Sequence, residues 1–469
     1  MVFSSVQFLF VFLPLALAVY YLVPRGGKNL VLALFSLIFC VFGGIRYTAL
    51  LAAFAALNFL CGLAICHVPA RGKKPLLVLS LGLDLALLGF FKYAGFFAAA
   101  VNAVLPLHLP VLDIALPLGI SFYTFQGMSY CIDIYRGKYP PTGNPLRFFL
   151  FLGFFGHLGS GPIVRWDYQA AALDPAGRTL SLEQFCYGAK RIIYGLAKKS
   201  ILADQLGLLY QSVASVSPAE LPGPVLFFGY LAFVLELYFD FSGYSDMAVG
   251  LGALFGLPLS ENFDYPFLSR TVGEYWRRWH MTLSAWFREY VYFPLGGSRR
   301  GLFRTCLNLM IVFTLTGLWH GAAWQYVVFG IYHGLLLCAE RLFLNRALGR
   351  APAWVSHVYL PVAIYIGLTI FGAPGLAGGL LTLKGIFTMQ AGAAGYTLQA
   401  FLAPKTVLLL LAAIALCGPV QAAVPGLRAR LRSREVPAAG EMIFLFVLLF
   451  FSIMRVTAGN YSAFIYAQF

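Results

Sequence analysis

The chain has 469 residues, of which 60% are hydrophobic and 11% charged, and its formal net charge is +15. Soluble globular domains carry roughly 25% charged residues, so the composition excludes an ordinary soluble protein and indicates a chain embedded in lipid along its length. In a soluble protein the positive charge would suggest nucleic acid. Here the basic residues lie between apolar segments, so membrane topology explains them and we expect no nucleic-acid partner.

Apolar segments recur in chain order at lengths that suit a membrane crossing. The clearest are the segments 8–23, 47–68, 221–235, 355–371, 406–424 and 442–454. A helix needs about 20 apolar residues to span the hydrocarbon core, so the shorter segments cross with help from neighbours or re-enter the same face. With the less regular stretches between them, we expect an all-α polytopic protein of about ten to twelve tilted membrane helices, plus re-entrant and interfacial helices.

The first apolar segment also has the core of a signal peptide, but Met1–Ser5 lacks the basic residues that would precede one. No internal repeat, low-complexity tract or soluble domain interrupts the chain, so we treat residues 1–469 as one integral membrane domain. The eight cysteines lie mostly in apolar runs without a Cys-X-X-Cys pair. We interpret them as reduced packing residues and expect no metal site.

Basic residues alternate between successive loops. Arg25 and Lys28 follow the first apolar segment, residues 71–74 follow the segment 47–68, and the cluster 428–434 precedes the last segment. Cytoplasmic loops carry the excess of Lys and Arg, so the pattern predicts a multi-pass protein of the bacterial inner membrane with its N-terminus outside. Residues 184–205 mix basic and apolar positions, which predicts an amphipathic helix on the anionic lipid of the inner surface.

The segment 275–290 has the periodicity of one amphipathic helix. An aromatic and apolar stripe recurs at helical spacing, formed by Tyr275, Trp279, Leu283, Trp286 and Tyr290. The opposite side carries the polar residues Arg277, His280, Ser284 and Arg288. Trp276 and Arg278 stand beside them in the sequence. Guanidinium groups bind phosphate and keep a nearby imidazole neutral by repulsion, so the helix is a candidate border of a donor site with His280 as base. The alternative is that His280 only completes a hydrogen-bond network at the interface.

His320 lies in the apolar stretch 309–330, which we expect to be a membrane helix. A histidine in such a segment is costly and by default marks a functional site or its partner. Trp319 and Trp324 flank it as rigid walls, and the small residues beside it leave room for a substrate. A neutral imidazole is a suitable general base for a hydroxyl group. The alternative is a packing histidine bonded to a neighbouring carbonyl, which we favour for His333.

A dense polar cluster follows the segment 221–235. Its members are Glu236, Asp240, Ser242, Tyr244, Ser245 and Asp246. Charges this close to an apolar helix must face a cavity or one another, so Asp240 and Asp246 orient a histidine, line a path for an acceptor, or serve as scaffold. The chain has no P-loop, dinucleotide-binding glycine pattern, GxSxG elbow or HExxH motif, which favours proton transfer by histidine over a Ser-His-Asp triad.

Three motifs in the middle of the chain are long and specific: YFDFSGYSDMAVGLGALFG, ENFDYPFLSRTVGEYWRRWHMTLSAWFREYVYFPLGG and LTGLWHGAAWQYVVFGIYHG. Together with LPLGISFYTFQGMSYCIDIYRG, HLGSGPIVRW and the ending SAFIYAQF, they resemble the membrane-bound O-acyltransferase (MBOAT) family. The likeness is greatest to the alginate O-acetyltransferase, AlgI-like branch, and more distant to the DltB-like branch that transfers D-alanine. It extends over nearly the full chain, with a motif-rich core at about residues 225–345.

The resemblance implies a ring of tilted helices around a thinned centre, with a funnel joined to a tunnel. It implies that His320, in the WHG motif, is catalytic and that His280, in the RWHxTLS motif, is the second functional position. It also implies a cytoplasmic acyl thioester such as acetyl-CoA as donor substrate, with no bound cofactor. The acyl group would pass to a polysaccharide acceptor, or to an extracytoplasmic SGNH or esterase-like acyltransferase partner that completes O-acetylation of an exported or cell-wall polymer.

Two other functions remain open. One is D-alanyl transfer to teichoic acid within the same fold, and the other is a non-enzymatic polymer or lipid transporter. Transporters often contain inverted repeats, and the sequence shows none. For the enzyme, we expect a continuous polar path that joins His280 to His320, walled by Trp276, Trp319 and Trp324, because transfer must otherwise cross roughly 30 Å of hydrocarbon.

Overall fold

The computed structural model describes residues 1–105, 107–112, 114–178, 180–458 and 464–465, and these residues form helices and no strands. Within these described ranges, seven helical segments are long and apolar enough to cross a membrane: α3 (Ile45–His67), α4 (Ala70–Val104), α11 (Gly223–Leu254), α14 (Gly301–His320), the segment Trp324–Arg350, α17 (Ala353–Gly372) and α23 (Ala439–Thr457). Four shorter apolar segments accompany them: Phe8–Leu22, Pro145–Leu158, α18 (Leu376–Phe387) and α20 (Pro404–Leu416). A multi-pass all-α membrane protein is therefore confirmed, and the number of crossings stays a prediction.

Shorter helices connect and cover these segments. In the first half they are α1 (Leu13–Leu22), α2 (Lys28–Val41), α5 (Ile120–Tyr135), α6 (Pro145–Gly153), α7 (Phe155–Leu158), α8 (Trp166–Leu173), α9 (Leu182–Ala197) and α10 (Asp204–Ala214). In the second half they are α12 (Val272–Arg278), α13 (Met281–Phe287), α15 (Trp324–Ala339), α16 (Asn345–Arg350), α19 (Leu398–Phe401), α21 (Pro419–Ala423) and α22 (Leu427–Leu431). The ending SAFIYAQF lies outside the described residues except for 464–465.

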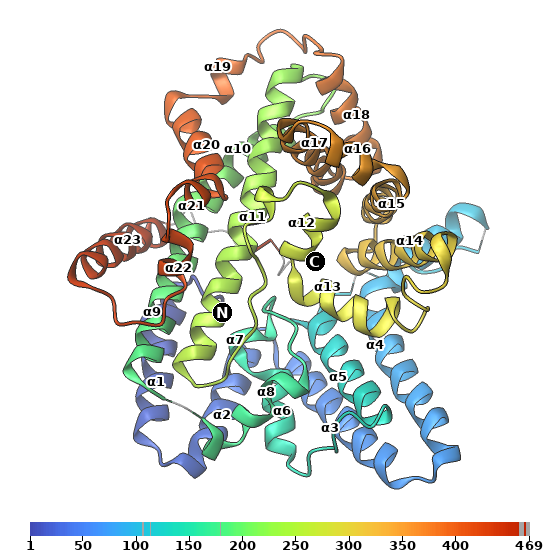
Figure 1. Ribbon diagram of the computed structural model, residues 1–469, viewed down its shortest axis with the longest axis vertical. Coiled ribbons are helices and arrows are strands. Elements are labelled where there is room, and N and C mark those ends of the chain that lie inside the picture. Colours follow the sequence, from blue (N-terminus) through green and yellow to red (C-terminus); the bar gives the residue numbers. More distant parts are fainter. Residues whose placement is uncertain (106, 113, 179, 459–463, 466–469) are drawn as a thin grey trace.

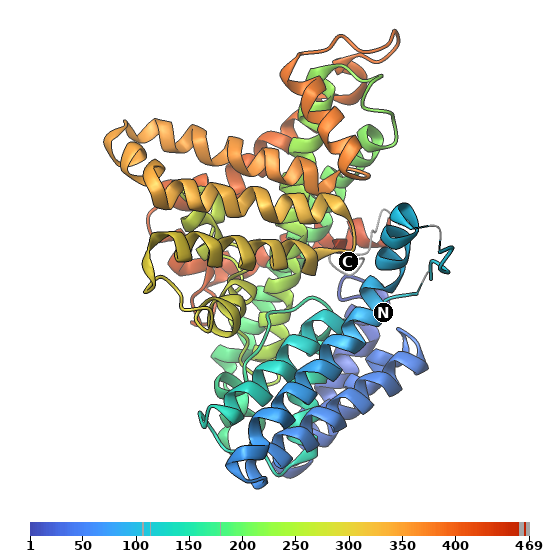
Figure 2. The same ribbon diagram turned by 90° about the vertical axis from the view of Figure 1, so that its right-hand side faces the viewer.

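Helix α11 is the axis of the molecule and is buried along most of its length. It packs against α9 and α10 on one side and α17 and α18 on another. Figure 2 shows the N-terminal helices at one end of the molecule and α14 to α18 at the other, with α11 running between them. The sequence predicted a span that ends at residue 235, but α11 continues to Leu254, because the polar residues beyond 235 are buried inside the same helix and pair with α9.

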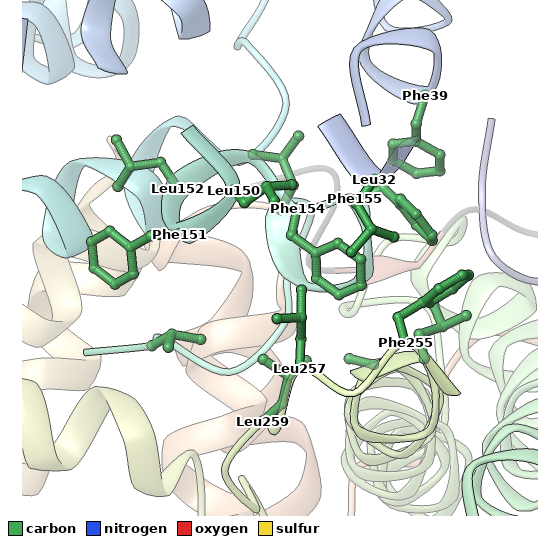
Figure 3. Close-up of a cluster of buried hydrophobic side chains, with 14 of the residues drawn as sticks. Leu32, Phe39, Leu150, Phe151, Leu152, Phe154, Phe155, Phe255, Leu257 and Leu259 are labelled. Carbon is green, nitrogen blue, oxygen red and sulfur yellow. The ribbon is translucent and has the colours of Figure 1, made fainter. Parts of the chain in front are cut away.

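The loop after α11 is anchored in a hydrophobic cluster (Figure 3). Phe255 and Leu257 are fully buried, and the Phe255 ring packs edge-on against Phe154 and Phe155 at centroid distances of 6.1 and 5.5 Å. Burying an aromatic or leucine side chain contributes about 1.5–3 kcal/mol. The cluster therefore fixes the start of the loop 255–265, which enters the centre of the fold.

Three expected helices are broken. The segment 275–290 divides at His280 into α12 and α13, and the segment 309–330 divides after His320 into α14 and α15. The segment 406–424 divides at Gly418, where φ is 164° and a proline follows at the start of α21. Hydrophobic periodicity does not register a break of one to three residues, so the sequence patterns ran through all three.

The basic residues of α9 do not lie on the membrane surface as predicted. Lys190 and Arg191 are buried, and so is Lys199 in the π-helical turn that continues α9. Arg191 pairs with Asp246 of α11 and Lys199 pairs with Asp240 at 2.7 Å. The amphipathic pattern arises because the basic face docks on the acidic residues of α11, which supply the counter-charges that a buried cation needs.

Candidate active site

His280 occupies the break between α12 and α13, where its backbone has a φ of 44° in the left-handed region. The loop 255–265 forms backbone hydrogen bonds with the residues on both sides of this break. The Asp264 N–H donates to the carbonyl of Arg278 at 2.9 Å, and the Met281 N–H donates to the carbonyl of Asn262 at 3.0 Å. A non-glycine residue in this conformation costs of order 1–3 kcal/mol and is found mainly at functional sites.

The side chain of Asn262 fixes the tautomer of His280. Its Oδ1 accepts from the backbone N–H of Thr282 at 3.2 Å and lies 3.2 Å from His280 Nδ1. Its Nδ2 donates to Ser245 Oγ at 3.4 Å. Since an amide oxygen only accepts, Nδ1 of His280 must carry the hydrogen, and Nε2 carries the lone pair of the neutral ring.

The environment of His280 is aromatic rather than cationic. Its side chain is 0% exposed and its ring lies 4.7 Å from Phe241 and 5.7 Å from Trp319 between centroids. Burial lowers the pKa of His280 to about 3. The sequence attributed a neutral imidazole to repulsion by Arg277 and Arg288; this explanation is wrong, because both arginines are exposed and burial is the cause.

The segment HLGSGPIVRW, at 157–166, also reaches this site. The Ile163 N–H donates to Thr282 Oγ1 at 3.0 Å, and that hydroxyl donates to Asn262 Oδ1 at 3.0 Å. Ser284 is less central, because its Oγ donates to the carbonyl of Trp276 at 3.1 Å within the α12–α13 hairpin. Three of the sequence motifs therefore meet at the Asn262–His280 pair: HLGSGPIVRW, the motif that contains Ser245 and the motif that contains His280.

His320 is the last residue of α14 and is 2% exposed. Its ring packs against Trp319, Phe371 and Phe329 at centroid distances of 5.0, 5.2 and 6.0 Å. It lines a cavity of about 10 Å³, which is close to the smallest space that holds one water. The other residues that line this His320 cavity are Leu237, Tyr275, Trp276, Trp279, Phe329, His333, Ile364, Leu368 and Phe371.

The expected continuous path between the two histidines is not open in this structure. Trp319 contacts both imidazoles, but His280 does not line the His320 cavity. Trp276 lines that cavity as predicted, whereas Trp324 is 58% exposed and does not line it, so its place on a substrate path stays a prediction. Trp324 moves to the surface because α14 ends at His320 and a new helix, α15, begins at Trp324.

A second, larger cavity of about 350 Å³ lies on the other side of α11. We call it the α9–α22 cavity, and its inner wall includes Tyr238, Ser242 and Ser245 of α11, so it ends one hydrogen bond from Asn262. The Tyr238 ring lies 6.2 Å from the Trp279 ring, which lines the His320 cavity. The remaining walls are apolar side chains such as Ile201, Leu427 and Leu448, and a charged border formed by Arg191, Lys198, Asp246, Glu261 and Arg432.

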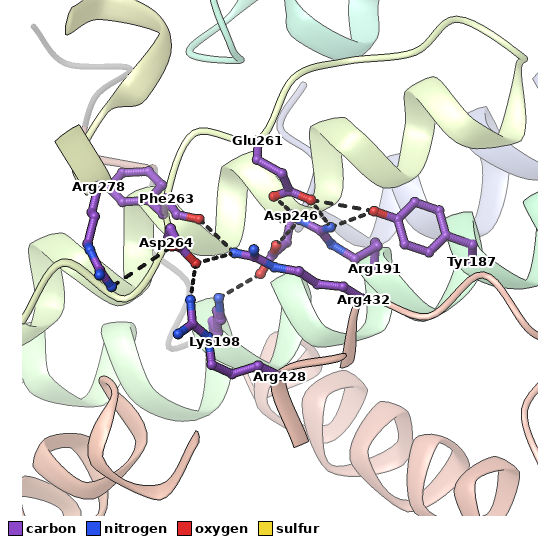
Figure 4. Close-up of polar contacts among 10 residues, drawn as sticks. All are labelled: Tyr187, Arg191, Lys198, Asp246, Glu261, Phe263, Asp264, Arg278, Arg428 and Arg432. Atoms are coloured by element: carbon purple, nitrogen blue, oxygen red, sulfur yellow. Dashed lines mark hydrogen bonds and ion pairs between the residues drawn. The ribbon is translucent and has the colours of Figure 1, made fainter. Parts of the chain in front are cut away.

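An ion-pair network closes the border of the α9–α22 cavity (Figure 4). Asp264 pairs with Arg428 at 2.6 Å and with Arg432 at 3.0 Å, and Arg278 lies at 4.0 Å. Burial alone would raise the pKa of Asp264, but the three guanidinium groups hold it below its ordinary value. Of the predicted donor-site arginines, only Arg278 joins this network, and it also pairs with Glu274 at 2.8 Å.

Asp240 and Asp246 serve as counter-charges for the basic helix. Asp246 pairs with Lys198 at 2.6 Å and with Arg191, and Asp240 pairs with Lys199. Asp246 also borders the α9–α22 cavity, whereas Asp240 does not. Among the described residues, no group of histidine, cysteine or acidic side chains could hold a metal ion.

Sequence reasoning missed Asn262, Thr282 and Lys92. Asn262 and Thr282 stand in the same motif as His280, but no periodicity marks a residue that forms hydrogen bonds at an interruption between two helices. Lys92 lies in the apolar stretch 76–104 of α4, apart from the basic residues 71–74 at the start of that helix, and intramembrane charges are functional candidates by default. That signal was present and could have been used.

The sequence matches the MBOAT, membrane-bound O-acyltransferase family over residues 140–373. The chain is 35% identical to the probable alginate O-acetylase AlgI of Azotobacter vinelandii, with 100% of both chains covered. It is 31% identical to the peptidoglycan O-acetyltransferase of Helicobacter pylori, covering 82% of this chain and 80% of that one. It is 29% identical to the teichoic acid D-alanyltransferase of Bacillus subtilis, covering 53% and 68%. The chain therefore belongs to the membrane-bound O-acyltransferase family.

Proposed function

We propose that this protein is an O-acetyltransferase that acetylates an exported or cell-wall polysaccharide. The family membership and the relatives that O-acetylate alginate or peptidoglycan support this function. The observation that carries it is that the buried rings of His320 and His280 both pack against Trp319. Two buried histidines suit proton transfer to and from oxygen and sulfur.

The α9–α22 cavity is the best-supported place for the donor thioester. Its charged border includes Lys198 and Arg432, which are partly exposed and suit the phosphate and polar groups of acetyl-CoA or a related thioester. Its apolar walls suit the arm that carries the acyl group, and its inner end lies beside the Ser245–Asn262–His280 chain. Arg432 on its border belongs to the basic cluster 428–434, which the positive-inside rule assigns to the cytoplasm.

The reaction then follows from ordinary acyl-transfer chemistry. His320 removes the proton from an acceptor hydroxyl, and the oxygen attacks the thioester carbonyl. The carbon–sulfur bond breaks, the acyl group remains on the acceptor oxygen, and the imidazolium returns its proton to the thiolate leaving group. No external oxidant or base is consumed. Because Tyr238 and Trp279 stand between the two cavities, these rings must rotate for the thioester to reach His320.

The acceptor would approach at the C-terminal end of α14, where His320 lies. Two residues beyond His320 the chain borders a shallow hollow of about 660 Å³, lined by Ala322, Ala323, Trp324 and Gln325 together with α4 and the start of α18. In the proposed orientation, with the N-terminus outside the inner membrane, this hollow faces the polymer or the esterase-like partner. The enzyme thus transfers the acyl group while the donor stays on the cytoplasmic side.

Replacement of His320 tests this function. His320→Gln should lower acetyl transfer from labelled acetyl-CoA by at least about 100-fold, because general-base catalysis contributes 10²- to 10⁴-fold. His357→Gln, an exposed position on α17, is the control and should match the wild type per mole of folded protein. Near-normal transfer by His320→Gln overturns the assignment, and incorporation of D-alanine in preference to acetate overturns the choice of acyl group.

A further inference from the structure

Two consecutive residues of α4 bind the end of α14 immediately before His320. Lys92 Nζ donates to the carbonyl of Trp319, and Tyr93 Oη donates to the carbonyl of Leu318 at 2.7 Å. Lys92 Nζ also lies 3.5 Å from Ser121 Oγ and 5.6 Å from the centre of the Trp319 ring. The amine therefore has a carbonyl, a hydroxyl and an indole as its neighbours.

A third residue of α4 braces the other flank of the histidine. Phe96 stands one helical turn after Lys92, so both lie on one face of α4. Its ring packs edge-on against Trp324 at a centroid distance of 5.6 Å. Helix α4 packs mainly against α3 and α5, so these side chains reach across from a helix that is supported elsewhere. Lys92 and Tyr93 therefore contact the chain before the His320–Ala323 turn, and Phe96 contacts it after the turn.

The physical need for such a brace is clear from the position of His320. The last four carbonyls of a helix have no partner within it, and in a membrane each unsatisfied group costs several kcal/mol. The residue after His320 is Gly321 in an extended conformation, so the helix ends abruptly at the histidine. A helix C-terminus also carries partial negative charge, which an ammonium group complements. A charge is otherwise costly in a membrane helix, so its placement at this carbonyl has a specific purpose.

We infer that Lys92 is a positioning residue for the acyl transfer. It holds the C-terminus of α14 so that the His320 side chain keeps its position in the His320 cavity. This inference rests on the proposed role of His320. Tyr93 and Phe96 support the same turn, and Lys92 supplies the charge-assisted bond nearest the histidine. A displacement of about 1 Å at a reacting group can lower the rate 10²-fold, so loss of this bond should act on turnover rather than on donor binding.

The chain contains a matched control for the test. Lys28 also binds a carbonyl near the C-terminus of another helix, since its Nζ donates to the carbonyl of Tyr20 in α1 at 2.7 Å and lies 4.1 Å from the Tyr20 ring. It has the same kind of partners as Lys92 but stands far from the histidines in the fold, in the N-terminal cluster. Lys28→Met therefore removes an equivalent interaction without touching the turn at His320.

The experiment compares Lys92→Met, Lys92→Arg, Lys28→Met and His320→Gln in the full-length protein in detergent or liposomes. We expect Lys92→Met to lower kcat by about 10- to 100-fold, with the KM for acetyl-CoA changed less than about twofold. Lys92→Arg should recover part of kcat, since guanidinium keeps the charge and the donors. Lys28→Met should retain the wild-type kcat per mole of folded protein, even though it lowers the melting temperature.

A second readout is independent of activity. Diethyl pyrocarbonate modifies imidazole, and the labelled fraction of His320 is measured by mass spectrometry of the purified protein. Lys92→Met should raise the rate of labelling at His320, and Lys28→Met should not. If His320→Gln is inactive while Lys92→Met has wild-type kcat and labelling, the positioning role is overturned and the proposed function stands. If His320→Gln is active, the proposed function fails first. Equal losses in Lys92→Met and Lys28→Met would also overturn the inference.

Discussion

The side-chain oxygen of Asn262 and the Nδ1 atom of His280 lie 3.2 Å apart, and the same oxygen accepts from both the N–H and the hydroxyl of Thr282. One amide thus caps the start of α13, holds the break that contains His280 and selects the tautomer of its ring. It also links His280 to Ser245 on the wall of the α9–α22 cavity. The residue that organises the site is therefore neither of the two histidines but Asn262, which stands near the start of the motif that contains His280.

Asn262→Ala should lower turnover by at least about 10-fold, because the His280 ring loses the acceptor that fixes its orientation. The measurement is kcat for acetyl transfer at saturating acetyl-CoA. Asn29→Ala is the matched control, since Asn29 is a buried asparagine that donates to the Leu173 carbonyl at 2.9 Å, far from the site. A wild-type kcat for Asn262→Ala would contradict the role assigned here.

Filling the α9–α22 cavity should weaken donor binding. Val420→Trp places a large ring in the cavity from α21, whereas Ala422→Trp adds the same ring on the exposed side of that helix. We expect Val420→Trp to raise the KM for acetyl-CoA by about 10-fold or more while kcat changes less, which is the pattern of lost ground-state binding. Equal KM values for the two variants would place the donor elsewhere.

The arginines near His280 should not be equivalent. Arg278→Gln removes partners of Glu274 and Asp264, so the border of the cavity should loosen and the KM for the donor should rise about two- to fivefold, in keeping with the modest strength of exposed ion pairs. Arg277→Gln should match the wild type, because Arg277 is exposed and lies off the cavity border. Steady-state kinetics over a range of donor concentrations separates the two, and a larger effect at Arg277 would revive direct phosphate binding by that side chain.

The Asp264 network should give a defined acid limit to stability. Its arginines hold the pKa of Asp264 below the ordinary value, so the carboxylate binds fewer protons when the protein is folded. The stabilisation is then fully present above the unfolded pKa of about 3.9 and is lost as the pH falls through the folded value. We expect the melting temperature of wild type to exceed that of Asp264→Asn at pH 6, and the difference to shrink below about pH 4. A difference that grows on acidification would contradict the shift.

Much of the fold could be read from the sequence, because long apolar segments and loop charges are properties of single segments. The expected helix 355–371 corresponds to α17 and 442–454 lies within α23. The break at His280 could not be read in this way, because it depends on Asn262, which is distant along that motif and acts through the backbone of α13. The inward direction of Arg191 and Lys199 likewise depends on partners in α11. The catalytic roles of His280 and His320 stay predictions.

The aromatic pair between the two cavities has a consequence for the cell as well as for the reaction. Tyr238 and Trp279 lie 6.2 Å apart between ring centres, one facing each cavity. A permanently water-filled passage at this point would let protons run down the gradient that an energised membrane maintains. With the rings in place, we expect no continuous water-filled passage between the two cavities, and the barrier needs to yield only while an acyl arm itself occupies the gap. The bound substrate would then itself fill the gap between the two rings while they are apart.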